Sequence, residues 1–152
     1  MNSIPKEIKV AVKGQSENAT RLNLSAGKFN MIIDEPQSAG GTDAGPSPIQ
    51  VLLMSLAGCI NVTGHLVAKQ KGLQLNGMKL TIEGVMNPAA FYGASFDERA
   101  GFQQITVTVD ADFNGASQKE IEDWLKETED RCPVTDNIKA VTNVSVKIKD
   151  AI

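Results

Sequence analysis

The chain has 152 residues, of which 41% are hydrophobic and 22% are charged, and its formal net charge is -3. These values favour one soluble globular domain over residues 1–152. They argue against nucleic acid as a partner, because binding it requires a basic surface. The N-terminal residues lack a charged segment followed by an apolar run, so we expect no secretory signal and a cytoplasmic location.

The first third of the chain has the pattern of β-structure. Apolar residues alternate in residues 7–13 and 28–34, which predicts two strands, and residues 21–24 predict a further strand between them. Residues 34–48 are rich in Gly, Pro and Asp, so we expect a loop that leads into a helix.

A long apolar helix is predicted after this loop. Pro48 is typical of a first helical turn, and Ser47 and Gln50 fit the N-cap and N3 positions of a capping box. The helix is expected to end near Lys71, with Gly72 as its left-handed stop. Its length would suit a membrane span. Polar residues interrupt it and lysines close it, however, so a buried helix explains it better than a membrane segment.

Alternation returns in the second half of the chain. Residues 78–86 and 102–113 are predicted to form half-buried strands, because apolar and polar side chains alternate along both. The residues between them, 87–101, are polar and irregular, and they fit either a flap over a site or a mobile loop.

Helical patterns dominate the C-terminal part. Residues 117–132 begin with a second capping box and predict an amphipathic helix, whose apolar stripe contains Ile121, Trp124 and Leu125. Pro133 interrupts the pattern and favours a short separate helix over residues 133–140. Residues 143–149 alternate as a final strand. The order of strands, long helix, strands, helices and strand indicates an α+β fold.

The two cysteines are the main candidates for chemistry. Cys59 lies in the middle of the long helix, where a thiol is either a small buried hydrophobe or a reactive group. Cys132 precedes Pro133, and a sulfur at a helix start lies near unsatisfied N–H groups that lower a thiol pKa. A cap residue without function has the same pattern, so both interpretations of Cys132 stay open.

The single histidine, His65, projects from a different face of the long helix than Cys59, so no Cys–His dyad is expected. We interpret His65 as an interior or interface residue. One histidine and two cysteines without a Cys-x-x-Cys motif give no recognisable ligand set for a metal. We therefore expect neither a metal nor a cofactor.

Residues 40–59, GGTDAGPSPIQVLLMSLAGC, are followed later by RCPV and a short helix. This combination resembles the osmotically inducible protein C and organic hydroperoxide resistance (OsmC/Ohr) family, and the likeness covers nearly the whole chain. The resemblance implies an α+β intertwined homodimer in which antiparallel-rich sheets wrap the long helix that bears the first cysteine. A second chain would also cover a helix that is apolar on almost all sides.

The resemblance further implies a thiol peroxidase without metal or haem. In that mechanism Cys59 attacks an organic hydroperoxide and becomes a sulfenic acid, Cys132 condenses with it to a disulfide, and a dithiol such as a lipoylated protein reduces the disulfide. Active members also use an arginine from an N-terminal hairpin and a carboxylate at the start of the cysteine helix. Arg21 lies in the first region, whereas Ile49 and Gln50 occupy the second, which indicates a weakened or retuned peroxidase.

Two other functions remain open at this point. One is a non-peroxidatic OsmC-like protein whose pocket binds an apolar ligand or handles other sulfur species. The other is a dimeric structural protein with inert thiols. The reaction of the thiols with cumene hydroperoxide separates the peroxidase from both alternatives.

Overall fold

The structure, a computed structural model, describes residues 3–149 and has the predicted α+β class, with helices and antiparallel strands. The first two and last three positions of the expected domain lie outside the described residues. The chain forms two compact units, Met1–Leu52 and Leu53–Ile152, which are described separately below. A single domain over residues 1–152 stays a prediction.

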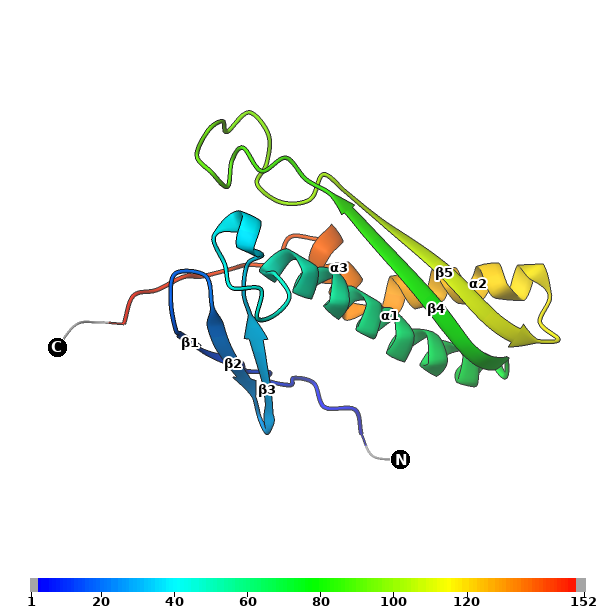
Figure 1. Ribbon diagram of the computed structural model, residues 1–152. Coiled ribbons are helices and arrows are strands. Elements are labelled where there is room, and N and C mark those ends of the chain that lie inside the picture. Colours follow the sequence, from blue (N-terminus) through cyan, green and yellow to red (C-terminus); the bar gives the residue numbers. More distant parts are fainter. Residues whose placement is uncertain (1–2, 150–152) are drawn as a thin grey trace. The chain divides into compact units, whose positions relative to one another are not determined.

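The first unit contains a three-stranded antiparallel sheet in the order β1 (Lys13–Ser16), β2 (Leu22–Ala26) and β3 (Phe29–Ile33) (Figure 1). Gly27 has a φ of 58° in the turn between β2 and β3, a left-handed conformation that glycine adopts without steric cost. The strands predicted near residues 21–24 and 28–34 are confirmed by β2 and β3.

Two predicted strands, over residues 7–13 and 143–149, do not form in the single chain. Only Lys13 of the first segment belongs to a strand, and the second segment has no regular structure. Both predictions are wrong because a strand needs a neighbour for its backbone groups, and neither segment has one within residues 3–149. The apolar side chains that alternate along both segments are 60–95% exposed: Ile8, Val10, Val12, Val144, Val146 and Ile148.

The Asp34 carboxylate organises the loop between β3 and the long helix. It is fully buried and accepts hydrogen bonds from the N–H groups of Glu35 (2.8 Å), Thr42 (3.0 Å) and Ala44 (3.2 Å), and from the Thr42 hydroxyl. These donors, the Thr42 hydroxyl foremost, hold the pKa of Asp34 well below its usual range. The predicted loop, which includes η1 (Gln37–Ala39), is therefore held in one conformation before the long helix begins.

The long helix, α1 (Pro48–Lys71), has the predicted bounds, and Gly72 follows it with a φ of 72°. The Gln50 side-chain oxygen accepts the Ser47 N–H at 2.8 Å, which forms one arm of the predicted capping box. Among the described residues, α1 is one helix that is long and apolar enough to cross a membrane, with 33% of its most apolar window buried. The core helix of a soluble protein meets the same criterion, so this is weak evidence for a membrane.

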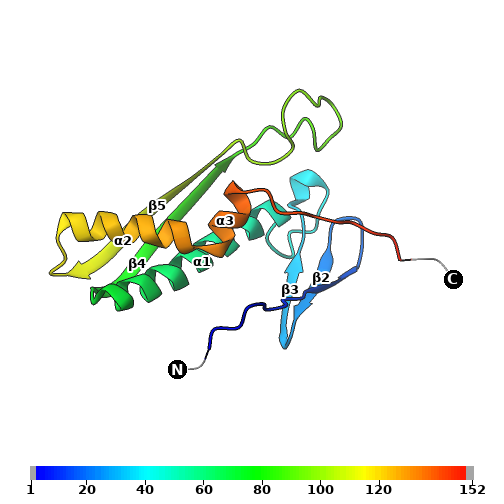
Figure 2. The same ribbon diagram turned by 180° about the vertical axis from the view of Figure 1, so that it is seen from behind.

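The second unit is built on a long antiparallel hairpin of β4 (Gln74–Val85) and β5 (Gln104–Asn114). Figures 1 and 2 show α1 and α2 (Gln118–Arg131) running along this hairpin, with α3 (Pro133–Lys139) after α2. Side chains alternate along both strands between half-buried apolar and exposed polar residues, as the sequence predicts. The half-buried side chains pack against the helices.

One core cluster lies around Trp124 of α2 and includes Val67 and Ala68 of α1. Trp124 is 1% exposed, its Nε1–H donates to the Gly64 carbonyl at 2.8 Å, and the Phe113 ring meets it edge-on at 4.9 Å between centroids. A Cβ at Gly64 would lie 3.0 Å from the Trp124 ring, so the absence of a side chain there makes room for that ring against α1.

Helix α2 begins with the complete capping box that the sequence predicts, in which Ser117 and Glu120 cap each other's backbone N–H groups. The predicted apolar stripe is narrower than expected. Trp124 is buried and Ile121 packs beside it, but Leu125 is 42% exposed because the core reaches only one side of α2.

Residues 86–103 connect β4 and β5 as an irregular loop. Its base is tied by hydrogen bonds from the Asn87 amide to Glu98 (2.8 Å) and from the Asn87 N–H to the Gln103 side chain (3.0 Å). Its tip exposes three aromatic side chains, Phe91, Tyr92 and Phe96. The alternatives of a flap or a mobile loop both remain predictions.

Candidate functional site

The two cysteines come together in the second unit. Cys59 lies on α1 and Cys132 lies between α2 and α3, and their sulfur atoms are 2.8 Å apart. Both are free thiols, because this separation exceeds the bonded S–S distance of about 2.05 Å. The fold therefore places in contact two thiols that are 73 positions apart in the sequence.

The position of Cys132 follows from the break between α2 and α3. Pro133 disfavours helical geometry at the residue before it, and Cys132 has an extended backbone with φ -78° and ψ 111°. Cys132 thus ends α2 and caps α3, where its sulfur accepts the Thr135 N–H at 3.5 Å. The predicted location of Cys132 at a helix junction is confirmed.

An apolar cluster surrounds the sulfur pair. Leu56 and Ile60 of α1 are buried against it. Partly buried apolar residues of the hairpin and α3 complete it: Leu80, Ile82, Ile105, Val107, Val134 and Ile138. Cys132 is 0% exposed whereas Cys59 keeps part of its surface accessible, so a reagent from solvent meets Cys59 first.

The two thiols differ in acidity. Burial and the neighbouring Cys132 raise the pKa of the Cys59 thiol. Burial acts on Cys132 in the same raising direction, but hydrogen bonds from Cys59 and from Thr135 outweigh it and lower the pKa of Cys132. The thiol with the lower pKa is therefore the less accessible of the two.

The sequence did not single out the hydroxyl groups that contact the two sulfurs. Thr63 hydrogen-bonds Cys59, and Thr135 hydrogen-bonds Cys132 through both its backbone and its side chain. The spacing could have revealed both. Thr63 follows Cys59 by one helical turn, and Thr135 occupies the N3 position that a capping side chain contacts.

Arg21 and Gln50, the predicted supporting residues, belong to the first unit. The Arg21 Nε lies 3.1 Å from the Glu17 carboxylate, and Gln50 is occupied in capping Ser47. His65 is exposed on α1, so the interpretation of an interior histidine is wrong for the single chain, whereas an interface position stays a prediction.

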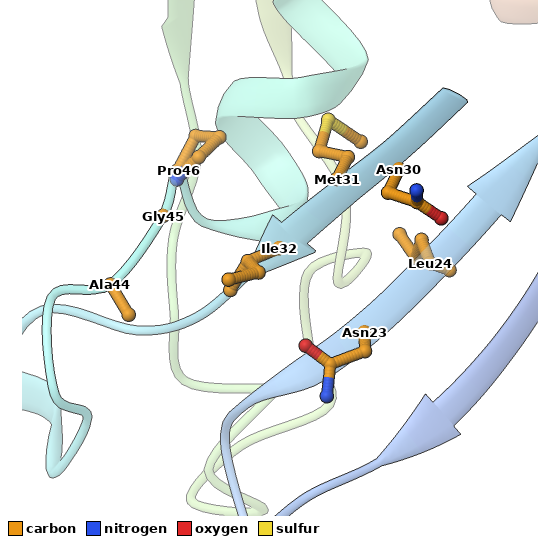
Figure 3. A pocket seen from close by; sticks show the side chains of 8 residues that line it. All are labelled: Asn23, Leu24, Asn30, Met31, Ile32, Ala44, Gly45 and Pro46. Atoms are coloured by element: carbon orange, nitrogen blue, oxygen red, sulfur yellow. The ribbon is translucent and has the colours of Figure 1, made fainter. Parts of the chain in front are cut away.

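A hollow of about 490 Å³ lies on the first unit, lined by residues of β2, β3 and the loop that precedes α1 (Figure 3). Asn23 and Asn30 supply its polar side chains, while Leu24, Met31 and Ile32 supply much of its apolar wall. None of its lining residues is a cysteine or another titratable residue, so this hollow is a separate feature from the thiol pair. Among the described residues, no cluster of three or more His, Cys, Asp or Glu side chains could hold a metal ion.

Comparison with known proteins relates this geometry to a family. The model of a family described as OsmC-like protein matches residues 40–147, and no curated protein is significantly similar in sequence. A solved OsmC-like protein from Mycoplasma pneumoniae is 20% identical with a TM-score of 0.77, and the match covers 89% of this chain and 90% of that one.

Two proteins named for organic hydroperoxide resistance also share the fold. The one from Legionella pneumophila is 20% identical with a TM-score of 0.63, over 87% of this chain and 90% of that one. OhrB of Bacillus subtilis is 17% identical with a TM-score of 0.55, over 84% of this chain and 88% of that one.

Proposed function

Because the chain belongs to the OsmC-like family, we propose that it is a thiol peroxidase that reduces small organic hydroperoxides through Cys59 and Cys132. The observation that carries this proposal is the contact of two free sulfurs at 2.8 Å, one accessible and one buried. A sulfenic acid formed on the accessible sulfur would have its thiol partner already beside it.

The reaction proceeds in two steps. The Cys59 sulfur attacks the terminal oxygen of the hydroperoxide, the O–O bond breaks, and an alcohol leaves. The Cys132 thiolate then attacks the Cys59 sulfenic acid, which forms the disulfide and releases the second oxygen as water. The apolar wall of Leu56, Ile60 and Ile82 favours substrates with a hydrocarbon substituent over hydrogen peroxide.

A dithiol reductant completes the cycle by exchange with the disulfide. A lipoylated protein in the cytoplasm has the required chemistry, since its two thiols reduce a protein disulfide and cyclise. Arg21 and Gln50 are assigned supporting roles at the start of the reaction. A glutamine cannot form a salt bridge with a guanidinium as a carboxylate does, so Gln50 supports a peroxidase of reduced rate.

The protein acts as an intertwined homodimer in this proposal. Apolar side chains of α1 are 41–68% exposed in the single chain: Ile49, Leu52, Met54, Val62 and Leu66. The segments 7–13 and 143–149 add alternating apolar residues without strand partners. A second copy would supply both the cover and the missing strands, because surfaces of this kind rarely stay exposed. Sedimentation that shows a folded monomer at micromolar concentration would contradict the dimer.

A second candidate function, the handling of other sulfur species, is favoured by the neutral side chain at Gln50. A thiol pair can exchange with disulfides or persulfides without an activating cation, provided that one sulfur is a thiolate. This candidate function uses the same two cysteines, so the two candidates can be distinguished only by testing which substrate reacts with them.

A turnover assay tests the proposed function. The protein is mixed with cumene hydroperoxide and dihydrolipoamide, and alcohol formation is measured beside the variants Cys59→Ser and Cys132→Ser. We expect sustained turnover that both substitutions abolish. A protein that leaves cumene hydroperoxide intact but exchanges with cystine or a persulfide through both cysteines would instead support the second candidate.

A further inference from the structure

The largest influences on the pKa values of the two thiols come from burial, hydrogen bonds and the partner thiol, with no charged side chain among them. α1 contributes Leu56, Ile60 and Thr63, the hairpin contributes Leu80, Ile82, Ile105 and Val107, and α3 contributes Val134, Thr135 and Ile138. The proton that Cys59 must lose therefore has one acceptor within the cluster, which is the other sulfur.

Two thiolates at a separation of 2.8 Å would repel each other strongly in an apolar environment, so the pair carries at most one negative charge. The donors around the pair decide where that charge lies. Cys132 receives hydrogen bonds from the backbone and side chain of Thr135 and from the Val134 backbone, whereas Cys59 receives them from the Thr63 side chain and the Val134 backbone. The surplus of donors on Cys132 favours the arrangement Cys59–SH beside Cys132–S⁻.

Exposure separates the two roles further. In the singly ionised pair the charge lies on the fully buried sulfur of Cys132, while the accessible sulfur of Cys59 keeps the proton. Attack on a peroxide by a protonated thiol is slow, because the thiolate is the nucleophile. The Cys59 proton must therefore move as the reaction begins.

We propose that Cys132, besides closing the disulfide, is the general base that accepts the Cys59 proton when Cys59 attacks its substrate. This inference rests on the proposed function and adds a catalytic step to it. The contact of 2.8 Å between the sulfurs lies within the reach that direct proton transfer requires.

The step balances in atoms and electrons. The Cys59 S–H proton passes to Cys132–S⁻, the Cys59 sulfur forms an S–O bond and is oxidised by two electrons, and the O–O bond breaks and is reduced. Cys132–SH then gives the proton to the departing alkoxide, which yields the alcohol and restores Cys132–S⁻. That thiolate attacks Cys59–SOH, the S–S bond forms, and the hydroxide that leaves takes a proton from a buffer acid and becomes water.

Three substitutions of Cys132 distinguish a proton acceptor from a hydrogen-bond donor and from a residue with no role in the first step. Cys132→Asp supplies an anionic proton acceptor, Cys132→Ser supplies a hydrogen-bond donor, and Cys132→Ala supplies neither. None of them can form the disulfide, so the rate of loss of the Cys59 thiol reports the first step in each. At neutral pH we expect Cys132→Ala and Cys132→Ser to slow this step by about 10²-fold, and Cys132→Asp to recover most of the loss.

The dependence of the rate of Cys59 thiol loss on pH adds a measurement that would not change if Cys132 had only a structural role. The rates of the four proteins should converge at alkaline pH, where Cys59 ionises without help. A rate in Cys132→Ala equal to that of the unchanged protein would show that Cys132 only resolves the sulfenic acid. Recovery by Cys132→Ser but not by Cys132→Asp would show that Cys132 donates a hydrogen bond to a Cys59 thiolate. Either result overturns the proposal.

Two measurements keep the test independent of folding and of peroxidase activity. In the unchanged protein, loss of the Cys59 thiol should be slower in D₂O than in H₂O, whereas attack by a preformed thiolate would show no slowing and would contradict the proposal. Alkylation of Cys59 by iodoacetamide requires loss of the same proton, so the four proteins should keep the same order of rates. That order holds or fails even if cumene hydroperoxide is not a substrate.

Discussion

The two core clusters of the second unit both lie between α1 and the hairpin, but α2 closes the Trp124 cluster, whereas the α2–α3 junction and α3 close the cysteine cluster. The clusters also differ in how their polar groups find hydrogen-bond partners. In the Trp124 cluster the indole N–H has a permanent acceptor, the Gly64 carbonyl, and no ionisable group is involved. In the cysteine cluster the two sulfurs satisfy each other, so the chemical state of one changes the other. The Trp124 cluster joins α2 to α1, and the cysteine cluster brings two thiols into contact.

The Trp124 cluster also bears on the positions of the Cys59 and Cys132 thiols, which no covalent bond joins. Gly64 lies on α1 just beyond Cys59, and Trp124 precedes Cys132 on α2. The buried hydrogen bond between Trp124 and Gly64 therefore sets the separation of the sulfurs indirectly. Substitutions in the Trp124 cluster should change stability most, and substitutions in the cysteine cluster should change thiol reactivity most.

The largest effect on stability is expected from Trp124→Ala. Removing a fully buried ring leaves a cavity against Val67 and Phe113, and such substitutions typically cost about 3–5 kcal/mol of unfolding free energy. Denaturant titration measures the loss. The control Trp124→Phe keeps a ring but leaves the Gly64 carbonyl without this donor, so its cost should be smaller. A protein as stable as the original after Trp124→Ala would break the comparison.

A smaller loss is expected from Gly64→Ala. The added Cβ would lie 2.9 Å from the Met78 side chain and 3.0 Å from the Trp124 ring, and overpacking of this kind costs about 1–3 kcal/mol. Gly58→Ala is the matched control, because it lies on the same helix and, among the described residues, no atom outside its own turn of helix backbone lies within 4 Å of the added Cβ. The Tm of Gly64→Ala should be lower than that of Gly58→Ala. The reverse order would contradict the close contact between the Trp124 ring and α1 at Gly64.

The cysteine cluster, unlike the Trp124 cluster, makes stability depend on pH. Cys132 has a pKa below its ordinary value of 9.0, so its contribution rises with pH up to 9.0 and is lost as pH falls through the lowered pKa. Cys59 has a pKa above 9.0, so its contribution is present below 9.0 and is lost as pH rises through the raised pKa. The Tm of the reduced protein, minus that of a Cys59→Ala and Cys132→Ala double variant, should be greatest near pH 9. A difference in Tm that does not change with pH would contradict the opposite pKa shifts of the two thiols.

The smallest effect is expected from Lys71→Ala. Lys71 and Glu127 form an ion pair of 2.7 Å that joins α1 and α2, as the buried Trp124 hydrogen bond does, but both side chains are about one-third exposed. Solvent and salt screen such pairs, so the change in Tm should be the least of this series and should shrink further in high salt. A loss comparable to that of Gly64→Ala would mean that the surface pair fixes the helices.

The local patterns of the sequence predict most of the fold. Capping residues, Gly72 and the alternation along residues 78–86 and 102–113 are each set by near neighbours, so α1, α2 and the hairpin follow from them. The segments 7–13 and 143–149 have equally clear alternation but form no strand, because alternation says which face is apolar and not which strand lies beside it.

The candidate site was less predictable than the fold. The spacing of Cys59 and Cys132 does not give their contact, which depends on how α1 and α2 pack at Gly64, and only the family resemblance implied it. The opposite acidities of the two thiols depend on Thr63, Thr135 and the depth of burial. The positions of Thr63 and Thr135 can be inferred from local spacing, but the depth of burial and the contact between the sulfurs are tertiary properties that no local pattern indicates.

The most direct test of the two-cysteine mechanism is peptide mapping of the reduced protein after one equivalent of cumene hydroperoxide. The account predicts an intramolecular disulfide between Cys59 and Cys132, with one alcohol formed for each disulfide. Oxidation that stops at a Cys59 sulfinate with Cys132 still free, or two thiols that remain unreacted, would contradict it.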